Sequence, residues 1–195
     1  GLPAPVPVWG VIEPGAQRAA AATRNGRVGV IATESTVASG AYADALRRIE
    51  PELRIWSQSC PLLVPLIEEG WLGDSVTAEV ARRYLAPLLA HDIDTLVLGC
   101  THYPLIAPLL AGIAGDGVVL VDSAAAVSDQ VAVELAQRHL LAMTPPAASG
   151  LTAADHYCVT DTSERFERIA AAFLGRAVSL ELVDIGQPAP PANPA

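Results

Sequence analysis

The chain contains no lysine, because all twelve basic residues among its 195 are arginine. Mechanisms that need a side-chain amine are therefore excluded, including Schiff bases with pyridoxal phosphate and the phosphate-binding lysine of Walker A loops. The 21 acidic residues give a net charge of −9, and no basic run is present. This balance argues against nucleic acid as the primary ligand, since a phosphate backbone attracts clustered positive charge.

Cysteine is also scarce. Cys60, Cys100 and Cys158 are far apart and form no CxxC pair, so neither a disulfide framework nor a zinc ribbon is expected. The histidines show no spacing that would complete a metal site, and we predict none.

We expect a reducing, cytoplasmic location and no membrane partner, because no apolar run reaches the roughly 18–20 residues of a membrane span. GxSxG and GxGxxG motifs are absent, which gives serine hydrolases and dinucleotide enzymes no support.

Short runs rich in Val, Ile and Leu alternate with longer stretches of helical period, and this alternation predicts an α/β fold with a mostly parallel sheet. The predicted strands are Val6–Ile12, Arg27–Ala32, Leu53–Trp56, Thr95–Leu98, Val118–Val121, His156–Val159 and Val178–Val183. The predicted helices are Gly15–Thr23, Ser39–Arg48, Ser75–Leu89, Pro104–Ala114, Ser123–Ala142 and Thr162–Leu174, with Ser123 and Thr162 as N-caps. The proline-rich stretch 144–149 predicts a break between lobes, and residues 187–195 a disordered tail.

The most informative stretch is residues 95–106, TLVLGCTHYPLI. Cys100 follows a buried strand at its carboxyl end, which is where ligands bind in open α/β sheets. The start of a helix and the nearby His102 both favour a thiolate at neutral pH, the form that acts as a base or nucleophile. The alternative is a buried small side chain beside a helix cap. Ile106 stands where a Cys-x5-Arg phosphatase loop needs arginine, so phosphate-ester chemistry is disfavoured.

Other polar side chains also follow predicted strands. Thr33 and Thr36 lie in a hydroxyl-rich turn that suits either a bound carboxylate or simple helix capping. Glu68 ends a short helical stretch beyond Cys60, and it is either solvated or part of the chemistry. We interpret Cys158 as a packing residue, because it stands within the apolar alternation 157–159.

These segments resemble the glutamate racemases of the aspartate/glutamate racemase family. The stretch 98–104, LGCTHYP, is similar to the family's second active-site signature. Residues 10–16, 31–36 and 60–65 match further family segments, and the resemblance runs in order to about Val183. It implies an isomerase that interconverts L- and D-glutamate without a cofactor, for peptidoglycan synthesis and cell shape in bacteria. It also implies glutamate as the ligand and a possible homodimer.

The resemblance also assigns roles to individual residues. Racemisation needs two bases on opposite faces of the α-carbon, and the family uses one cysteine from each of two similar lobes. Cys100 matches the second cysteine, which is associated with deprotonating the L-enantiomer. Thr101 and His102 match substrate contacts, and His102 is also credited with assisting the thiol. Thr33 and Thr36 match hydroxyls near the substrate, and Glu68 matches a supporting carboxylate.

The family's first cysteine motif and its Asp-Ser-Gly start have no counterpart here. Cys60 aligns with a different position and does not replace the missing base. The resemblance therefore implies a first-lobe remnant and crossover at 1–14, a complete second lobe at 15–122, and the C-terminal part of the first lobe at 123–186. We expect that this chain lacks the family's N-terminal segment and is inactive alone. Two alternatives stay open: a non-catalytic dicarboxylate-binding lobe, and a racemase for aspartate or another amino acid.

Overall fold

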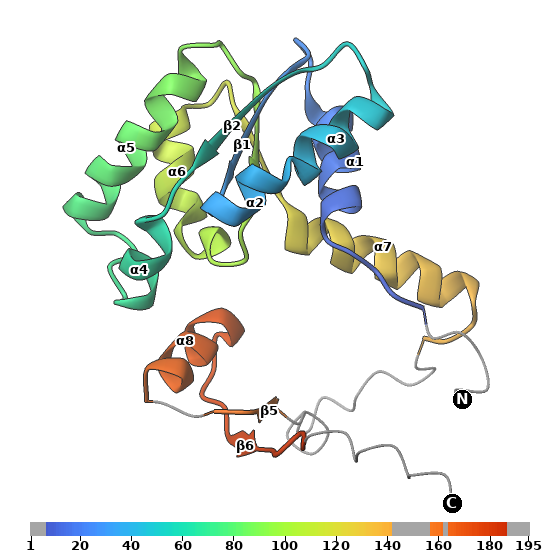
Figure 1. The fold of residues 1–195 in the computed structure, drawn as a ribbon, viewed down its shortest axis with the longest axis vertical. Helices are drawn as coiled ribbons and strands as arrows, with labels where there is room; N and C mark the ends of the chain where they lie inside the picture. Colours follow the sequence, from blue (N-terminus) through green and yellow to red (C-terminus); the bar gives the residue numbers. More distant parts are fainter. Residues whose placement is uncertain (1–6, 142–156, 162–163, 187–195) are drawn as a thin grey trace, which may run out of the picture. The chain divides into compact units, whose positions relative to one another are not determined.

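The structure is a computed structural model that describes residues 7–141, 157–161 and 164–186 (Figure 1). The chain divides into two compact units, residues 1–141 and residues 142–195. Within the described ranges, no helix is long and apolar enough to cross a membrane.

A four-stranded parallel sheet forms the centre of the first unit, with the strand order β2-β1-β3-β4. The strands are β1 (Arg27–Ala32), β2 (Arg54–Ser59), β3 (Thr95–Leu98) and β4 (Val119–Asp122). Around them lie α1 (Ile12–Ala22), α2 (Glu34–Ser39), α3 (Ala41–Ile49), α4 (Leu63–Glu68), α5 (Ser75–Leu89), the 3-10 turn η1 (Tyr103–Ile106), α6 (Ala107–Ala114) and α7 (Ser123–Gln137). The prediction of an α/β fold with a parallel sheet is confirmed.

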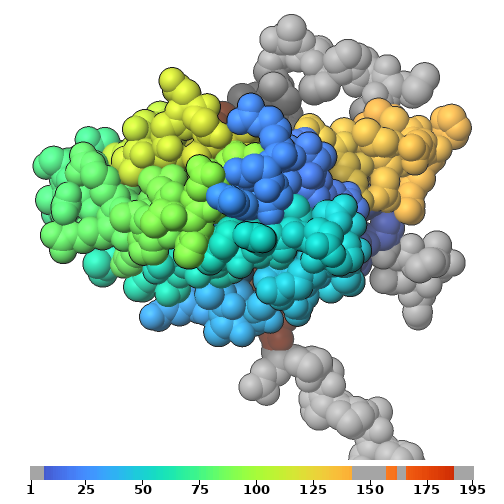
Figure 2. Space-filling view, turned by 90° about the horizontal axis from the view of Figure 1, so that it is seen from above, coloured from blue at the N-terminus to red at the C-terminus, as the bar shows by residue number. Residues whose placement is uncertain are grey.

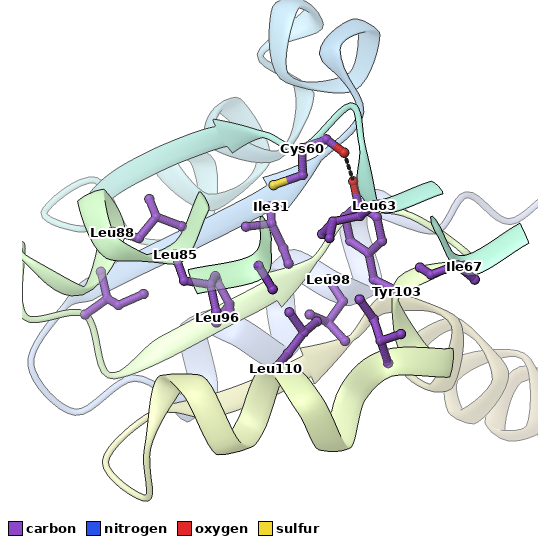
Figure 3. Packing of buried hydrophobic residues seen from close by; sticks show 13 residues of the cluster. Ile31, Cys60, Leu63, Ile67, Leu85, Leu88, Leu96, Leu98, Tyr103 and Leu110 are labelled. Atoms are coloured by element: carbon purple, nitrogen blue, oxygen red, sulfur yellow. Dashed lines mark hydrogen bonds between the residues drawn. The ribbon is translucent and has the colours of Figure 1, made fainter. Parts of the chain in front are cut away.

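Each face of the sheet has its own apolar core. Val28 and Val30 pack with residues of α1 and α3 on one face, while Ile31 points to the opposite face, towards α4, α5 and α6. On that face the buried Tyr103 hydroxyl donates a hydrogen bond to the carbonyl of Cys60 at 3.3 Å (Figure 3). Right-handed crossovers explain the two layers, because connections that run in opposite directions along a sheet place their helices on opposite faces. Figure 2 shows α5 in green and α7 in orange at opposite ends of this unit.

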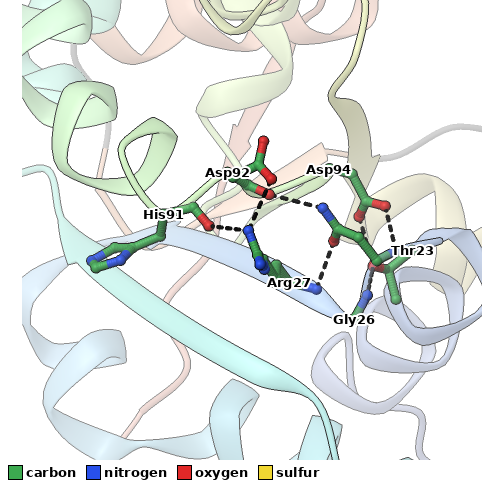
Figure 4. Close-up of polar contacts among 7 residues, drawn as sticks. Thr23, Gly26, Arg27, His91, Asp92 and Asp94 are labelled. Atoms are coloured by element: carbon green, nitrogen blue, oxygen red, sulfur yellow. Dashed lines mark hydrogen bonds and ion pairs between the residues drawn. The ribbon is translucent and has the colours of Figure 1, made fainter.

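The amino edge of the sheet is closed by Asp94, which lies just before β3. Its carboxylate accepts a hydrogen bond from the Thr23 hydroxyl at 2.6 Å (Figure 4). It also accepts from the backbone N–H groups of Arg24 and Asn25 at 2.7 and 2.8 Å. Burial opposes ionisation of Asp94, but these hydrogen bonds outweigh it and hold its pKa below the usual range. This carboxylate therefore fastens the end of α1 to the start of β3.

The predicted strand Val6–Ile12 is wrong. Residues 7–10 have no regular structure, and α1 begins already at Ile12. Proline lacks the N–H that a strand needs, so the spacing of Pro5 and Pro7 weakens any ladder there. Pro14 instead suits the first turn of a helix.

Three predicted helices are divided or end early, and the helix predicted over Gly15–Thr23 instead spans Ile12–Ala22. The helix predicted over Ser39–Arg48 is interrupted by Gly40, whose φ of 68° ends α2 and precedes α3, and α2 itself is unpredicted. The segment Pro104–Ala114 is divided into η1 and α6. The helix predicted over Ser123–Ala142 ends at Gln137, because His139 adopts a left-handed φ of 56°.

The second unit contains two parallel strands, β5 (Tyr157–Val159) and β6 (Leu180–Leu182), and the helix α8 (Glu164–Leu174). These elements overlap the predicted strands and helix of this part of the chain. The predicted break at 144–149, the predicted cap Thr162 and the predicted tail at 187–195 lie outside the described residues.

Candidate functional site

The predicted site residues follow β1, β2 and β3 at the carboxyl edge of the sheet. Connections leave the sheet in opposite directions from β1 and β3, so these neighbouring strands form the switch point where α/β folds bind ligands. The N–H of Gly99 donates to the carbonyl of Ile31 at 2.8 Å, which holds the two strand ends together. Thr33 comes directly after β1, and Cys100 comes shortly after the neighbouring strand β3.

Cys100, His102 and Glu68 form a continuous series of contacts. The Cys100 Sγ lies 4.0 Å from Nδ1 of His102. On the other side of the imidazole ring, Nε2 lies 3.2 Å from Oε1 of Glu68, and both of these side chains are mostly buried. Glu68 is the last residue of α4, so the connection after β2 supplies the carboxylate. The structure thus brings together three residues that are separated by up to 34 positions in the sequence.

The surroundings of Cys100 do not favour the thiolate form in the way that the sequence predicts. Burial raises its pKa, while hydrogen bonding involving the backbone of His102 and Tyr103 acts in the opposite direction without prevailing. The predicted long helix after Cys100 begins as a single 3-10 turn, which presents a weaker dipole than an α-helix. Burial therefore works against the thiolate that the sequence predicts, and the hydrogen bonds to the sulfur only partly offset it.

Thr33 and Thr36 contact each other. Thr33 is the N-cap of α2 and accepts a hydrogen bond from the N–H of Thr36 at 3.4 Å. Their hydroxyl oxygens are 2.9 Å apart. Helix capping is therefore observed, and both hydroxyls lie at the carboxyl edge. Thr101, in contrast, is exposed beside Cys100.

A small cavity of about 50 Å³ adjoins the Cys100 turn. Its polar lining includes Cys100, Thr101, Tyr42, Asp122 and Ser123. Tyr42 was not predicted as a site residue, since a tyrosine in an alanine-rich helix gives no functional signal. Ser123 was predicted as an N-cap, but Asp122 caps α7 by accepting from the N–H of Ala124 at 2.8 Å.

The other two cysteines differ from Cys100. Cys60 is fully buried, and burial raises the pKa of its thiol to about 12. Cys158 is exposed on β5, so its interpretation as a packing residue is wrong. All three cysteines are free. Among the described residues, no group of three or more His, Cys, Asp or Glu side chains is arranged to hold a metal ion.

Known proteins resemble this chain in sequence and in structure. The family model described as Asp/Glu/Hydantoin racemase matches residues 3–131. A glutamate racemase of Syntrophus aciditrophicus is 51% identical over 176 residues, which cover 89% of this chain and 63% of that relative. One from Neisseria meningitidis is 46% identical over 182 residues, covering 93% of this chain and 65% of the relative.

Two crystal structures have the same fold. A glutamate racemase isoform from Bacillus anthracis superposes with a TM-score of 0.82 at 33% identity, covering 94% of this chain and 66% of that one. The Francisella tularensis glutamate racemase in complex with D-glutamate gives a TM-score of 0.78 at 32% identity, covering 89% and 62%. The chain spans less than two thirds of the length of the curated relatives described above. With the family model matching well over half of its residues, the chain belongs to the Asp/Glu/Hydantoin racemase family.

Proposed function

We propose that this chain carries the Cys100 side of a glutamate racemase centre, which removes and returns the α-proton of glutamate. The observation that carries the proposal is the series of contacts from Cys100 through His102 to Glu68 at the switch point of the sheet. The relatives named as glutamate racemases, and the structural neighbour in complex with D-glutamate, support glutamate as the substrate.

The geometry suggests how the thiol is activated. Glu68 accepts a hydrogen bond from Nε2–H of His102, which leaves the lone pair of Nδ1 directed towards the Cys100 sulfur. The S–H bond breaks as Nδ1 takes its proton, and the resulting thiolate removes the α-hydrogen of glutamate. A neighbouring base is needed because burial raises the pKa of Cys100. Neither a metal nor an organic cofactor enters these steps.

The hydroxyl groups near the thiol are suited to hold the substrate. We assign Thr33, Thr36 and Thr101 to the carboxylate and amino groups of glutamate, because hydroxyls both donate and accept hydrogen bonds. The contact between the Thr33 and Thr36 hydroxyls keeps two such groups side by side. The preference for glutamate over aspartate would depend on how far these hydroxyls lie from Cys100.

Inversion needs a second base on the opposite face of the α-carbon. The sequence contains one active-site cysteine motif of the family, the one around Cys100. We therefore propose that the chain exchanges the α-hydrogen of L-glutamate but does not by itself form D-glutamate. In this view residues 15–122 are one lobe, and residues 1–14 and 123–186 belong to the other. For a racemase centre that has both bases, we propose supply of D-glutamate for peptidoglycan in the bacterial cytoplasm and assembly as a homodimer.

Incubation with L-glutamate in D₂O tests this function. We expect deuterium to enter the α-position, with no D-glutamate detected by a chiral assay, and we expect Cys100→Ser to abolish the exchange. Cys158→Ser is the matched control, because its thiol is exposed and belongs to the second unit. Formation of D-glutamate that requires Cys100 would contradict inactivity of the chain alone. Glutamate binding without any exchange, unaffected by Cys100→Ser, would instead indicate a non-catalytic binding lobe.

A further inference from the structure

Tyr42 lies directly behind the turn that carries Cys100. The side chain belongs to α3 and is 4% exposed. A Cβ built on Gly99 would lie 3.0 Å from Cε2 of Tyr42 and 3.0 Å from the carbonyl oxygen of Ile31. The phenol ring therefore packs against the backbone of the residue that precedes the thiol, and it limits movement of this turn towards α3.

The hydroxyl of Tyr42 also contacts the residue that follows β4. It donates a buried hydrogen bond to Oγ of Ser123 at 2.9 Å. Ser123 is the first residue of α7 and follows β4 without a break. On its other side Ser123 is held by α1, where a Cβ on Gly15 would lie 2.5 Å from the same Oγ. One hydroxyl pair thus joins α1, α3 and the ends of β3 and β4.

These contacts lie next to the thiol of Cys100. Tyr42, Ser123 and Cys100 line the same cavity of about 50 Å³, a volume that holds only one or two water molecules. Because Cys100 is half-buried, a small outward shift of its turn would expose the sulfur to solvent and move it relative to His102. A displacement of about 1 Å in a reacting group is enough to reduce a rate severely.

We propose that Tyr42 is a positioning residue for Cys100, acting through its packing against Gly99 and its hydrogen bond to Ser123. The catalytic consequence rests on the proposed racemase function, whereas the positioning itself does not. The pair fixes the turn after β3 against β4 and α7, so that the thiol stays beside the imidazole. Neither hydroxyl needs to touch the substrate for this role.

Alkylation of the intact chain by iodoacetamide tests the proposal without requiring enzyme activity. Peptide mapping by mass spectrometry gives separate rates for Cys100 and for the fully buried Cys60. In Tyr42→Phe the ring remains but the hydrogen bond is lost, and we expect Cys100 to react about 2- to 10-fold faster, the effect of one buried hydrogen bond on local opening. The rate at Cys60 should stay unchanged.

Ser123→Ala removes the acceptor of the same hydrogen bond and should reproduce the result. Tyr84→Phe is the matched control, because the Tyr84 hydroxyl accepts only a 3.4 Å contact from the N–H of Leu62. Equal acceleration at Cys60 and Cys100 would indicate general loosening of the fold and would overturn the proposal, as would unchanged alkylation of Cys100 in both variants. If α-hydrogen exchange is measurable, its rate should fall in Tyr42→Phe while alkylation rises.

Discussion

The reactivity of Cys100 depends on its neighbours, because its own surroundings disfavour a charged sulfur. Burial raises the pKa of the thiol, and the imidazole of His102, whose Nδ1 lies 4.0 Å from the sulfur, is placed to take its proton. Glu68 in turn accepts from the far nitrogen of that ring and favours the tautomer in which Nδ1 keeps its lone pair and acts as a base. A carboxylate that does not contact the sulfur thus helps to orient the imidazole that does.

Glu68→Gln tests this dependence. The amide keeps the size of the side chain but removes the negative charge that faces Nε2 of His102. We expect α-hydrogen exchange in D₂O to fall by about 10- to 100-fold, the usual effect of losing such an orienting partner. Glu69→Gln is the control, since it changes the neighbouring exposed carboxylate. Exchange at the parent rate in Glu68→Gln would show that the contact with His102 has no role.

At the scale of elements, the site is assembled by the three connections that begin at the carboxyl edge of the sheet, after β1, β2 and β3. β1 and β3 lie in register, with Ile31 paired to Leu98, so the residues that follow them emerge side by side. The close approach at Gly99 depends on the missing side chain, because Ile31, Ala32 and Tyr42 occupy the space that a Cβ would need. The turn that presents Cys100 is therefore fixed by packing against two other elements.

Gly99→Ala should destabilise the chain by about 1–3 kcal/mol, the usual cost of forcing an extra methyl group into a packed site. Urea unfolding monitored by circular dichroism measures this loss. Gly112→Ala, in α6, is the matched control, because a Cβ there meets nothing within 4 Å and alanine favours a helix. An unchanged urea midpoint for Gly99→Ala would mean that the turn adjusts at no cost.

At the scale of the whole molecule, the first unit contains both apolar cores. Every buried member of the two clusters lies between Ala16 and Val121. Among the described residues, the apolar surface buried in these clusters is therefore contributed by the first unit. The series of contacts from Cys100 through His102 to Glu68 lies in the same unit.

A chain that ends at Leu141 should consequently fold and unfold as the full chain does. All three tryptophans, at positions 9, 56 and 71, belong to residues 1–141, so their fluorescence reports this unit in both chains. We expect the urea midpoint of the fluorescence change to differ little between the two. Loss of the cooperative transition in the shortened chain would show that residues 142–195 are needed for this fold.

Much of the sheet was predictable because its central strands are buried on both faces. β1 and β3 match the predicted Arg27–Ala32 and Thr95–Leu98, since short continuous apolar runs bounded by turn residues are typical of strands inside a parallel sheet. The helix boundaries were less predictable. The left-handed φ of Gly40 divides a helical stretch, and the period of the side chains gives no sign of such a conformation.

The sequence by itself determined the fold class, the family and the position of Cys100 after a buried strand, because these depend on local patterns and on a specific motif. Only the tertiary structure decided the direction in which the pKa of Cys100 is shifted and the pairing of Tyr42 with Ser123, which are 81 residues apart. Burial and long-range hydrogen bonds set those properties, and both arise only once distant segments pack together.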